Sequence, residues 1–452
     1  MPSPVTELPD PRQARVFRFT GCDYAAGEAR LRYAFDEGPA LVERIRFPDA
    51  PALAGARADS FQRALRLLHL LAGVSYYKAG VASELRIDGA GVDAATLDLL
   101  RAVYTHGLAE FAYRNGLDLR GRMHWRGQSA AASAAPALGL PPRTLVPIGG
   151  GKDSLVAIEA LRSIGAECTA AWVGNSPLIA ACAAHTGLPT LNIERTLAPE
   201  LFAYNRMGAW NGHVPVTAVN SAILVCAAIL YGHDSIAFAN ERSASSATLE
   251  YDGQPVNHQW SKGWDFEQAF AHAVRQGVAA DLHYCSLLRP WSELAVTRAF
   301  ARLPQYFGVF SSCNRNFRIL GPKPSDRWCG QCPKCHFVFL ALAPFLPKPR
   351  LLAIFGRNLL DDETQAAGFD ALLEYRGHKP FECVGEGAEA RAAMAALAQR
   401  PEWREDVLVA RFRSEILAQL DPAALALEPW LTPQGAHGVP ARLAPALAFL
   451  RA

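Results

Sequence analysis

The sequence has almost no excess of charge of either sign. Its 452 residues include 45 Lys plus Arg and 43 Asp plus Glu, so the formal net charge is +2 at pH 7. A protein that neutralises many phosphates along a nucleic acid is expected to be strongly basic, so this balance predicts no nucleic-acid partner. It remains compatible with a local basic pocket for a single nucleotide.

Long hydrophobic runs and a secretory signal are also missing. The most apolar stretches, Ala218 to Tyr231 and Phe337 to Leu346, are shorter than the roughly 20 residues of a membrane-spanning helix, so we expect buried helices there and no membrane partner. Residues 1–10 contain neither a basic head nor an apolar core. We therefore expect a cytoplasmic protein.

The sequence does contain enough apolar residues for a large core, with 50% hydrophobic and 19% charged residues. Strict alternation of apolar and polar residues between Val16 and Phe47 predicts a small antiparallel sheet with one face in water. Helical spacing follows at residues 60–71 and 94–115. We expect an N-terminal β-rich α+β module over residues 1–127 and a linker over the Ala/Ser/Pro-rich residues 128–143.

Strands and helices alternate after this linker. The sequence predicts apolar strands at residues 144–148, 169–173, 190–193 and 235–239, and helices at residues 154–163, 177–184 and 218–230. This order is typical of an α/β domain whose parallel sheet binds ligands at the C-terminal ends of its strands. We expect that domain to cover residues 144–340 and a mostly helical region, rich in Ala and Leu, to cover residues 341–452.

A glycine-rich loop, Gly149 to Ser154, joins the first predicted strand of this domain to its helix. Its glycines let backbone N–H groups approach a ligand, and together with the positive end of the helix they form an anion site. Lys152 adds a positive charge and Ser154 a hydroxyl. A Walker A loop would need Ser or Thr after Lys152, where Asp153 stands, and a dinucleotide loop would need glycine at position 154. The remaining alternative is a turn that only packs the helix on the sheet.

The run Gly-Gly-x-Asp-Ser in this loop resembles the PP-loop of the ATP pyrophosphatase superfamily, although Gly149 stands where Ser is usual. The resemblance implies that the loop holds the outer phosphates of ATP, with Mg²⁺ on the leaving pyrophosphate, so that AMP is transferred to a carboxyl oxygen. It also implies that the loops after the second and fourth strands, residues 173–176 and 240–243, hold the adenosine and face the acceptor. The implied ATP-binding residues are Gly149, Gly150, Gly151, Lys152, Asp153, Ser154, Val173, Gly174, Asn175 and Asn240.

Four of the ten cysteines follow the spacing C-x15-C-x2-C-x2-C, at Cys313, Cys329, Cys332 and Cys335. Thiolates two residues apart can grip one tetrahedral ion, and a distant fourth thiolate closes the shell. A structural zinc is the favoured interpretation. An iron–sulfur cluster is the main rival, and free cysteines packed in a core are the third possibility.

Residues 144–340 resemble 7-cyano-7-deazaguanine synthase, a PP-loop enzyme with a four-cysteine zinc site. The full layout, from Phe17-Arg-Phe-Thr20 through Gly-Gly-Gly-Lys-Asp-Ser to Trp328-Cys-Gly-Gln-Cys-Pro-Lys-Cys335 and the helical tail, resembles the UDP-N-acetyl-α-D-muramoyl-L-alanyl-L-glutamate epimerase (MurL) family. This resemblance implies an isomerase that converts the terminal L-Glu of UDP-MurNAc-L-Ala-L-Glu to D-Glu in peptidoglycan synthesis, forming AMP and pyrophosphate. Adenylation would neutralise the carboxylate beside Cα and acidify the α-proton, and a side-chain base could then remove it.

Several residues are candidates for moving that proton, and for each an ordinary satisfied or solvated side chain is the alternative. The candidates are Lys152 and Asp153 in the glycine-rich loop, Glu241 and Arg242 after the fourth strand, His213, His258, and Cys383 in the polar segment 376–383. Residues 76–78 and 125–126 offer aromatic and cationic surface for a uracil or diphosphate, with packing in the core or at its rim as the favoured alternative. Two other functions remain open, namely another PP-loop enzyme that makes an amide, nitrile or thiolated base, and a nucleotide-binding regulator without catalysis.

Overall fold

The computed structural model describes residues 8–89, 91–127, 130, 134–318 and 321–451 of a mixed α/β protein. The chain forms two compact units. Unit 1 comprises residues 1–143, 191–236 and 260–284, and unit 2 comprises residues 144–190, 237–259 and 285–452. Of the predicted linker, residues 128–129 and 131–133 lie outside the described residues, and the predicted boundaries at residues 127 and 340 stay predictions. Within the described ranges, no helix is long and apolar enough to cross a membrane.

The sheet of unit 1 starts as predicted with three antiparallel strands, β1 (Val16–Ala25), β2 (Glu28–Phe35) and β3 (Leu41–Arg46). Phe17, Phe19 and Tyr33 are fully buried while their neighbours in sequence are more exposed, which confirms the alternation. Two strands that the sequence analysis does not predict extend this sheet: β4 (Glu84–Ile87) joins β1 in parallel and β5 (His124–Arg126) joins β4 in parallel. These strands have four and three residues, too short for alternation to reveal.

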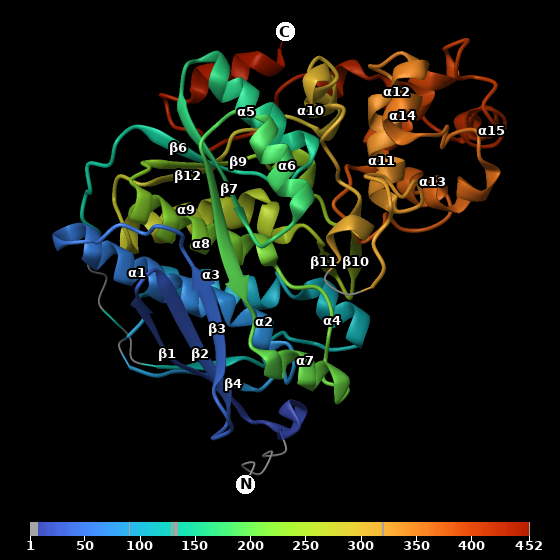
Figure 1. Cartoon of the computed structure of the whole chain (residues 1–452). Coiled ribbons are helices and arrows are strands. Elements are labelled where there is room, and N and C mark those ends of the chain that lie inside the picture. The colour runs from blue at the N-terminus through green and yellow to red at the C-terminus, as the bar shows by residue number, and fades with distance from the viewer. Residues whose placement is uncertain (1–7, 90, 128–129, 131–133, 319–320, 452) are drawn as a thin grey trace. The chain divides into compact units, whose positions relative to one another are not determined.

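Unit 1 also contains seven α-helices among its described residues. They are α1 (Gly55–Ala72), α2 (Val74–Tyr77), α3 (Ala94–Thr105), α4 (Ala109–Asn115), α7 (Pro199–Arg206), α8 (Val216–Tyr231) and α9 (Trp264–Gly277). Helix α1 packs on β1 and β2 and also on α8 (Figure 1). The predicted helix 94–115 is divided into α3 and α4 by a turn at residues 106–108, which contains Gly107.

Four strands with hydrogen-bonded order β12-β9-β6-β7 contribute their C-terminal ends to unit 2. They are β6 (Arg143–Pro147), β7 (Glu167–Val173), β9 (Ser235–Phe238) and β12 (His283–Ser286). The chain runs from β6 to β7 on one side and later to β9 on the other, so the strand order reverses at β6. In open α/β sheets such a switch point is where ligands bind. The glycine-rich loop, between β6 and α5 (Lys152–Ser163), lies at this point.

The rest of unit 2 is helical, with one hairpin formed by β10 (Leu249–Tyr251) and β11 (Gln254–Val256). The helices are α6 (Pro177–His185), α10 (Glu293–Phe300), α11 (Pro333–Leu342), α12 (Lys348–Phe355), α13 (Ala366–Leu373), α14 (Gly387–Ala398) and α15 (Val407–Arg411). Helices α11, α13 and α14 pack against one another (Figure 1). Helices α11 to α15 follow one another as far as Arg411, and the described residues 412–451 contain short 3-10 and π turns.

Candidate active site

In the glycine-rich loop, Gly150 has a backbone conformation that only glycine adopts easily. Gly150 has φ +81°, in the left-handed region, and a Cβ on Gly151 would lie 2.6 Å from Oγ of Ser312. The N–H of Ser311 donates to the carbonyl of Gly150 at 2.8 Å, so the loop lies against residues 311–312. Among the described residues, no side chain caps the start of α5. Its first N–H groups are therefore available to an anion.

Lys152 does not extend from this loop toward solvent. Its side chain is 1% exposed, and its ammonium forms ion pairs with Asp153 and Glu293. Burial alone would lower the pKa of Lys152, but the two carboxylates outweigh burial and raise it above its usual value. The ammonium is thus permanently charged and held by α10, while Asp153, with 26% of its side chain exposed, can reach a bound ligand.

The loop that follows β9 meets the first turns of α10 and α14. Ser243 donates to the carboxylate of Glu389 at 2.6 Å, and the N–H of Leu294 donates to the other oxygen of Glu389 at 3.1 Å. Burial raises the pKa of Glu389. Glu241 is 4% exposed, and its carbonyl accepts a hydrogen bond from Arg289 at 2.7 Å. Arg242 lies 5.9 Å from the centre of the Trp430 ring.

The adenosine-binding residues predicted from the resemblance lie at two strand ends. Val173 is the last residue of β7, Gly174 has φ +103°, and Asn175 is exposed, while Asn240 follows β9 and is 8% exposed. Helix α6, which starts directly after this β7 loop, contacts the glycine-rich loop: a Cβ on Gly150 would lie 3.6 Å from the side chain of Ile179.

Four thiols form a compact group in unit 2. The sulfur of Cys332 lies 3.5 Å from that of Cys335 and 4.0 Å from that of Cys313, and the sulfurs of Cys329 and Cys335 are 3.7 Å apart. A tetrahedral ion with metal–sulfur bonds of about 2.3 Å separates its sulfurs by about 3.8 Å. The four residues therefore fit one tetrahedral metal ion.

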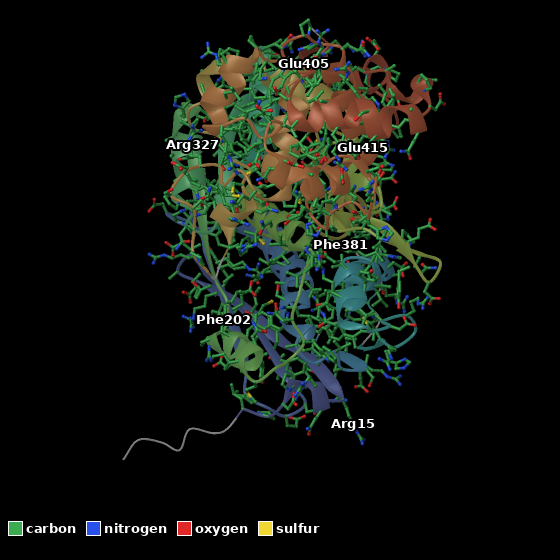
Figure 2. All side chains as sticks on the ribbon, turned by 90° about the vertical axis from the view of Figure 1, so that its right-hand side faces the viewer. Arg15, Phe202, Arg327, Phe381, Glu405 and Glu415 are labelled. Atoms are coloured by element: carbon green, nitrogen blue, oxygen red, sulfur yellow. The ribbon has the colours of Figure 1, made fainter. Side chains whose placement is uncertain are left out.

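The backbone around this thiol group is tied to the glycine-rich loop. The N–H of Gln331 donates to the sulfur of Cys329 at 3.4 Å, which helps to orient it. Arg327, labelled in Figure 2, donates to the carbonyls of Phe307 and Phe310 at 3.0 and 3.1 Å. Its own carbonyl accepts from Ser311 at 2.6 Å, and Ser311 bonds to the loop.

The polar segment 376–383 brings a carboxylate that the sequence analysis did not single out. The amide of Asn314 donates to Glu382, the neighbour of Cys383, and both side chains are half-buried. Burial raises the pKa of Glu382 to about 7, and the nearby His258 acts in the opposite direction. Gln259 donates to the carbonyl of Val384 at 3.2 Å, so residues 258–259 run beside residues 382–384. Phe381, labelled in Figure 2, marks this segment.

His213 and Lys78 belong to unit 1. Nδ1 of His213 lies 3.7 Å from Glu110, whose carboxylate also pairs with Arg114 at 2.7 Å. Lys78 donates to the side chain of Asn211 in the same loop as His213, and burial lowers the pKa of Lys78 to about 8.

Two of the aromatic groups considered for uracil, Tyr76 and Tyr77, are part of the core of unit 1, while Trp125 is half-buried. Tyr76 and Tyr77 are at most 1% exposed, and Trp125 stacks on Phe19 with ring centres 6.1 Å apart. The charged residues among residues 76–78 and 125–126 are Lys78 and the exposed Arg126.

The chain matches two protein-family models, the MurL N-terminal domain over residues 9–287 and the MurL C-terminal domain over residues 309–426. It is 61% identical over 437 residues to the UDP-N-acetyl-α-D-muramoyl-L-alanyl-L-glutamate epimerase of Xanthomonas oryzae pv. oryzae, covering 96% of this chain and 97% of the relative. The proteins of the same name from Micromonospora sp. and Salinispora tropica are 41% and 40% identical, covering 98% of this chain and 100% and 98% of the relatives.

Proposed function

Because the chain belongs to the UDP-N-acetyl-α-D-muramoyl-L-alanyl-L-glutamate epimerase (MurL) family, we propose that it inverts the α-carbon of the terminal L-Glu of UDP-MurNAc-L-Ala-L-Glu. The product carries D-Glu and serves as a peptidoglycan precursor. One observation carries this assignment: the 61% identity to a named epimerase over 96% of this chain. The sequence-based prediction of the family and of an isomerase is thereby confirmed.

The proposal includes ATP as the activating substrate, bound at the glycine-rich loop. The position of the loop at the strand-order reversal, the left-handed Gly150 and the uncapped start of α5 support an anion site there. Asp153 would hold Mg²⁺ on the pyrophosphate, and Lys152 would fix the Asp153 carboxylate through their ion pair. The residues 173–175 and Asn240 would hold the adenosine.

Adenylation solves the chemical difficulty of the reaction. Removal of a proton beside a free carboxylate places two negative charges on one enolate, whereas an acyl adenylate has an ester-like carbonyl that accepts the charge. General-base catalysis contributes about 10²- to 10⁴-fold to such a step. Reprotonation from the opposite face inverts the centre, and hydrolysis of the adenylate releases AMP and makes the sequence irreversible.

A structural zinc ion at the four cysteines completes the proposal. The sulfur spacing of 3.5 to 4.0 Å supports a single tetrahedral ion, because an iron–sulfur cluster would have to accommodate inorganic iron and sulfide between the thiols. Four protein ligands leave no open position, so the ion would supply structural stability and no chemistry.

Incubation of the protein with ATP, Mg²⁺ and UDP-MurNAc-L-Ala-L-Glu in D₂O tests the function. We expect deuterium at the α-carbon of Glu, together with AMP in at least stoichiometric amount. AMP without deuterium would indicate another PP-loop ligase or transferase, ATP binding without turnover would indicate a regulator, and ADP would contradict the adenylation.

A further inference from the structure

Three segments of unit 2 meet at the carboxylate of Glu382. Asn314 donates its side-chain amide to this carboxylate, and His258 lies near enough for its charge to act on it. The hydrogen bond from Gln259 to Val384 holds the segment of His258 beside that of Glu382. The carboxylate is therefore fixed in position by groups far apart in sequence, and it is only half-buried, so a ligand can reach it.

The same carboxylate lies close to the glycine-rich loop. Ser311 bonds to Gly150 at 2.8 Å, and Ser312 lies against Gly151. Asn314 follows Ser312 by two residues, and two residues of extended chain span about 7 Å at most. A short stretch of chain, residues 311–314, thus links the contacts of the glycine-rich loop to the carboxylate of Glu382.

We propose that Glu382 is the general base that removes the α-proton of the adenylated glutamate. This inference rests on the proposed function. In the step, the Cα–H bond breaks, its electron pair moves into the enolate of the acyl adenylate, and the proton passes to a carboxylate oxygen of Glu382. A second acid on the opposite face then donates the proton that forms the new Cα–H bond.

A carboxylate suits this role better at this position than at the protein surface. Partial removal from water strengthens it as a base, and the amide of Asn314 restricts its orientation. The titratable or charged groups that act on it are His258, Cys383, Cys332 and Lys334. The neighbouring Cys383 is the rival base.

The test compares wild type, Glu382→Gln, Glu382→Asp and Cys383→Ala with UDP-MurNAc-L-Ala-L-Glu and ATP in D₂O, measuring both AMP formation and deuterium at the α-carbon. We expect Glu382→Gln to form AMP within about 3-fold of wild type while the deuterium per AMP falls by about 10²-fold or more. Glu382→Asp should recover part of the exchange. Loss of exchange with AMP retained in Cys383→Ala, but not in Glu382→Gln, would assign the base to Cys383 and overturn the proposal.

Each other outcome is decisive. A folded Glu382→Gln variant that exchanges deuterium at the wild-type ratio, or that loses AMP formation equally, would overturn the role as base. If Glu382→Gln does not fold, the test uses Glu382→Asp instead. A ratio of deuterium to AMP equal to that of wild type in Glu382→Asp would then count against the proposal. Absence of substrate-dependent AMP in the wild type would instead refute the adenylation, and Glu382 with it.

Discussion

At the scale of single residues, the most constrained charge in the candidate site is the ammonium of Lys152. It is 1% exposed and held between the carboxylates of Asp153 and Glu293. A buried ion pair contributes little relative to an apolar replacement, but removal of one partner leaves an uncompensated charge that costs about 3–5 kcal/mol. The pair therefore joins α5 to α10 in a way that single substitutions disrupt strongly.

We predict that Lys152→Met and Glu293→Gln each lower the free energy of unfolding by about 3 kcal/mol or more. The double variant should lose less unfolding free energy than the two single variants together, with a coupling energy of about 1–3 kcal/mol. In the double variant neither Lys152 nor Glu293 remains as a buried charge that has lost its partner. Urea denaturation of the four proteins measures this cycle. Additive losses, or a Lys152→Met variant as stable as wild type, would show that the ion pair does not matter to stability.

A second residue-scale prediction concerns acid sensitivity. His69 is 4% exposed, its Nε2–H donates to the carbonyl of Arg32 at 2.9 Å, and burial lowers its pKa to about 4. The unfolded chain takes up a proton near pH 6.5 and the folded chain only near pH 4. The unfolded state thus binds more protons between these values, and stability falls as the pH decreases through this window.

The expected loss attributable to His69 is up to about 3 kcal/mol, from 1.36 kcal/mol per pKa unit. His69→Gln can keep the hydrogen bond without titrating, so its stability should depend less steeply on pH between 6.5 and 4. Denaturation midpoints at several pH values measure the slopes. Because burial also lowers the pKa of His233 to about 4, some pH dependence should remain in the variant. Identical slopes for the two proteins would contradict the prediction.

Sequence patterns identified the chain neighbours of the residues that form the candidate site more readily than those residues themselves. Cys383 was singled out for its chemistry, while Glu382 gains its interest only from Asn314, 68 positions away. Likewise, the sequence suggests that the charge of Lys152 faces an anion. Its ion-pair partner Glu293 is 141 positions away, so no local pattern predicts the pair. Local chemistry could be read from the motifs, but the pairing of distant side chains could not.

At the scale of the element, the three glycines of the glycine-rich loop differ in how strictly their positions require glycine. Gly149 has open space around a built Cβ and no left-handed φ, so it needs no glycine. Gly150 has φ +81°, and at Gly151 the oxygen of Ser312 is only 2.6 Å from a built Cβ. The three neighbouring glycines therefore differ in their tolerance of alanine.

We predict that Gly150→Ala raises the KM for ATP about 10-fold or more, since left-handed backbone costs a non-glycine residue about 1–2 kcal/mol and its strain displaces the N–H groups. Gly151→Ala should have a smaller effect, because its φ is ordinary and the Ser312 hydroxyl can rotate away. Gly149→Ala should stay within about 2-fold and serves as the matched control. Steady-state kinetics with varied ATP measures the three variants. Equal effects at the three positions would argue against phosphate binding by this loop.

Elements with clear periodicity were predictable, and those defined by tertiary contacts were not. The strands β1 to β3 and the alternation from β6 to β9 follow directly from apolar patterns, as does the buried α8. The short β4 gains its strand character from pairing with β1, and β5 from pairing with β4. A turn at residues 106–108 interrupts the helical pattern. Sequence periodicity carries no information on such partners.

At the scale of the whole molecule, the four-cysteine group is part of the main apolar core of unit 2. Cys313, Cys332 and Cys335 belong to a continuous cluster that extends from Val146 to Leu450, and α11 begins between two of the cysteines. A buried cluster of thiols contributes little hydrophobic stabilisation, and thiolates without a metal would repel one another. A bound ion would thus stabilise the core as well as the local turn.

We predict that the purified protein contains one zinc ion per chain, and that Cys332→Ser or Cys335→Ser loses the zinc and has a clearly lower melting temperature. Cys383→Ser is the matched control, because this half-buried cysteine lies outside the four-thiol group and should retain both zinc and stability. Elemental analysis and thermal melts with and without a chelator measure the effect. Iron in the purified protein would contradict zinc. A metal-free protein that melts as sharply and at the same temperature as its cysteine variants would contradict a metal-stabilised core, because the sulfur spacing would then reflect ordinary packing of neutral thiols.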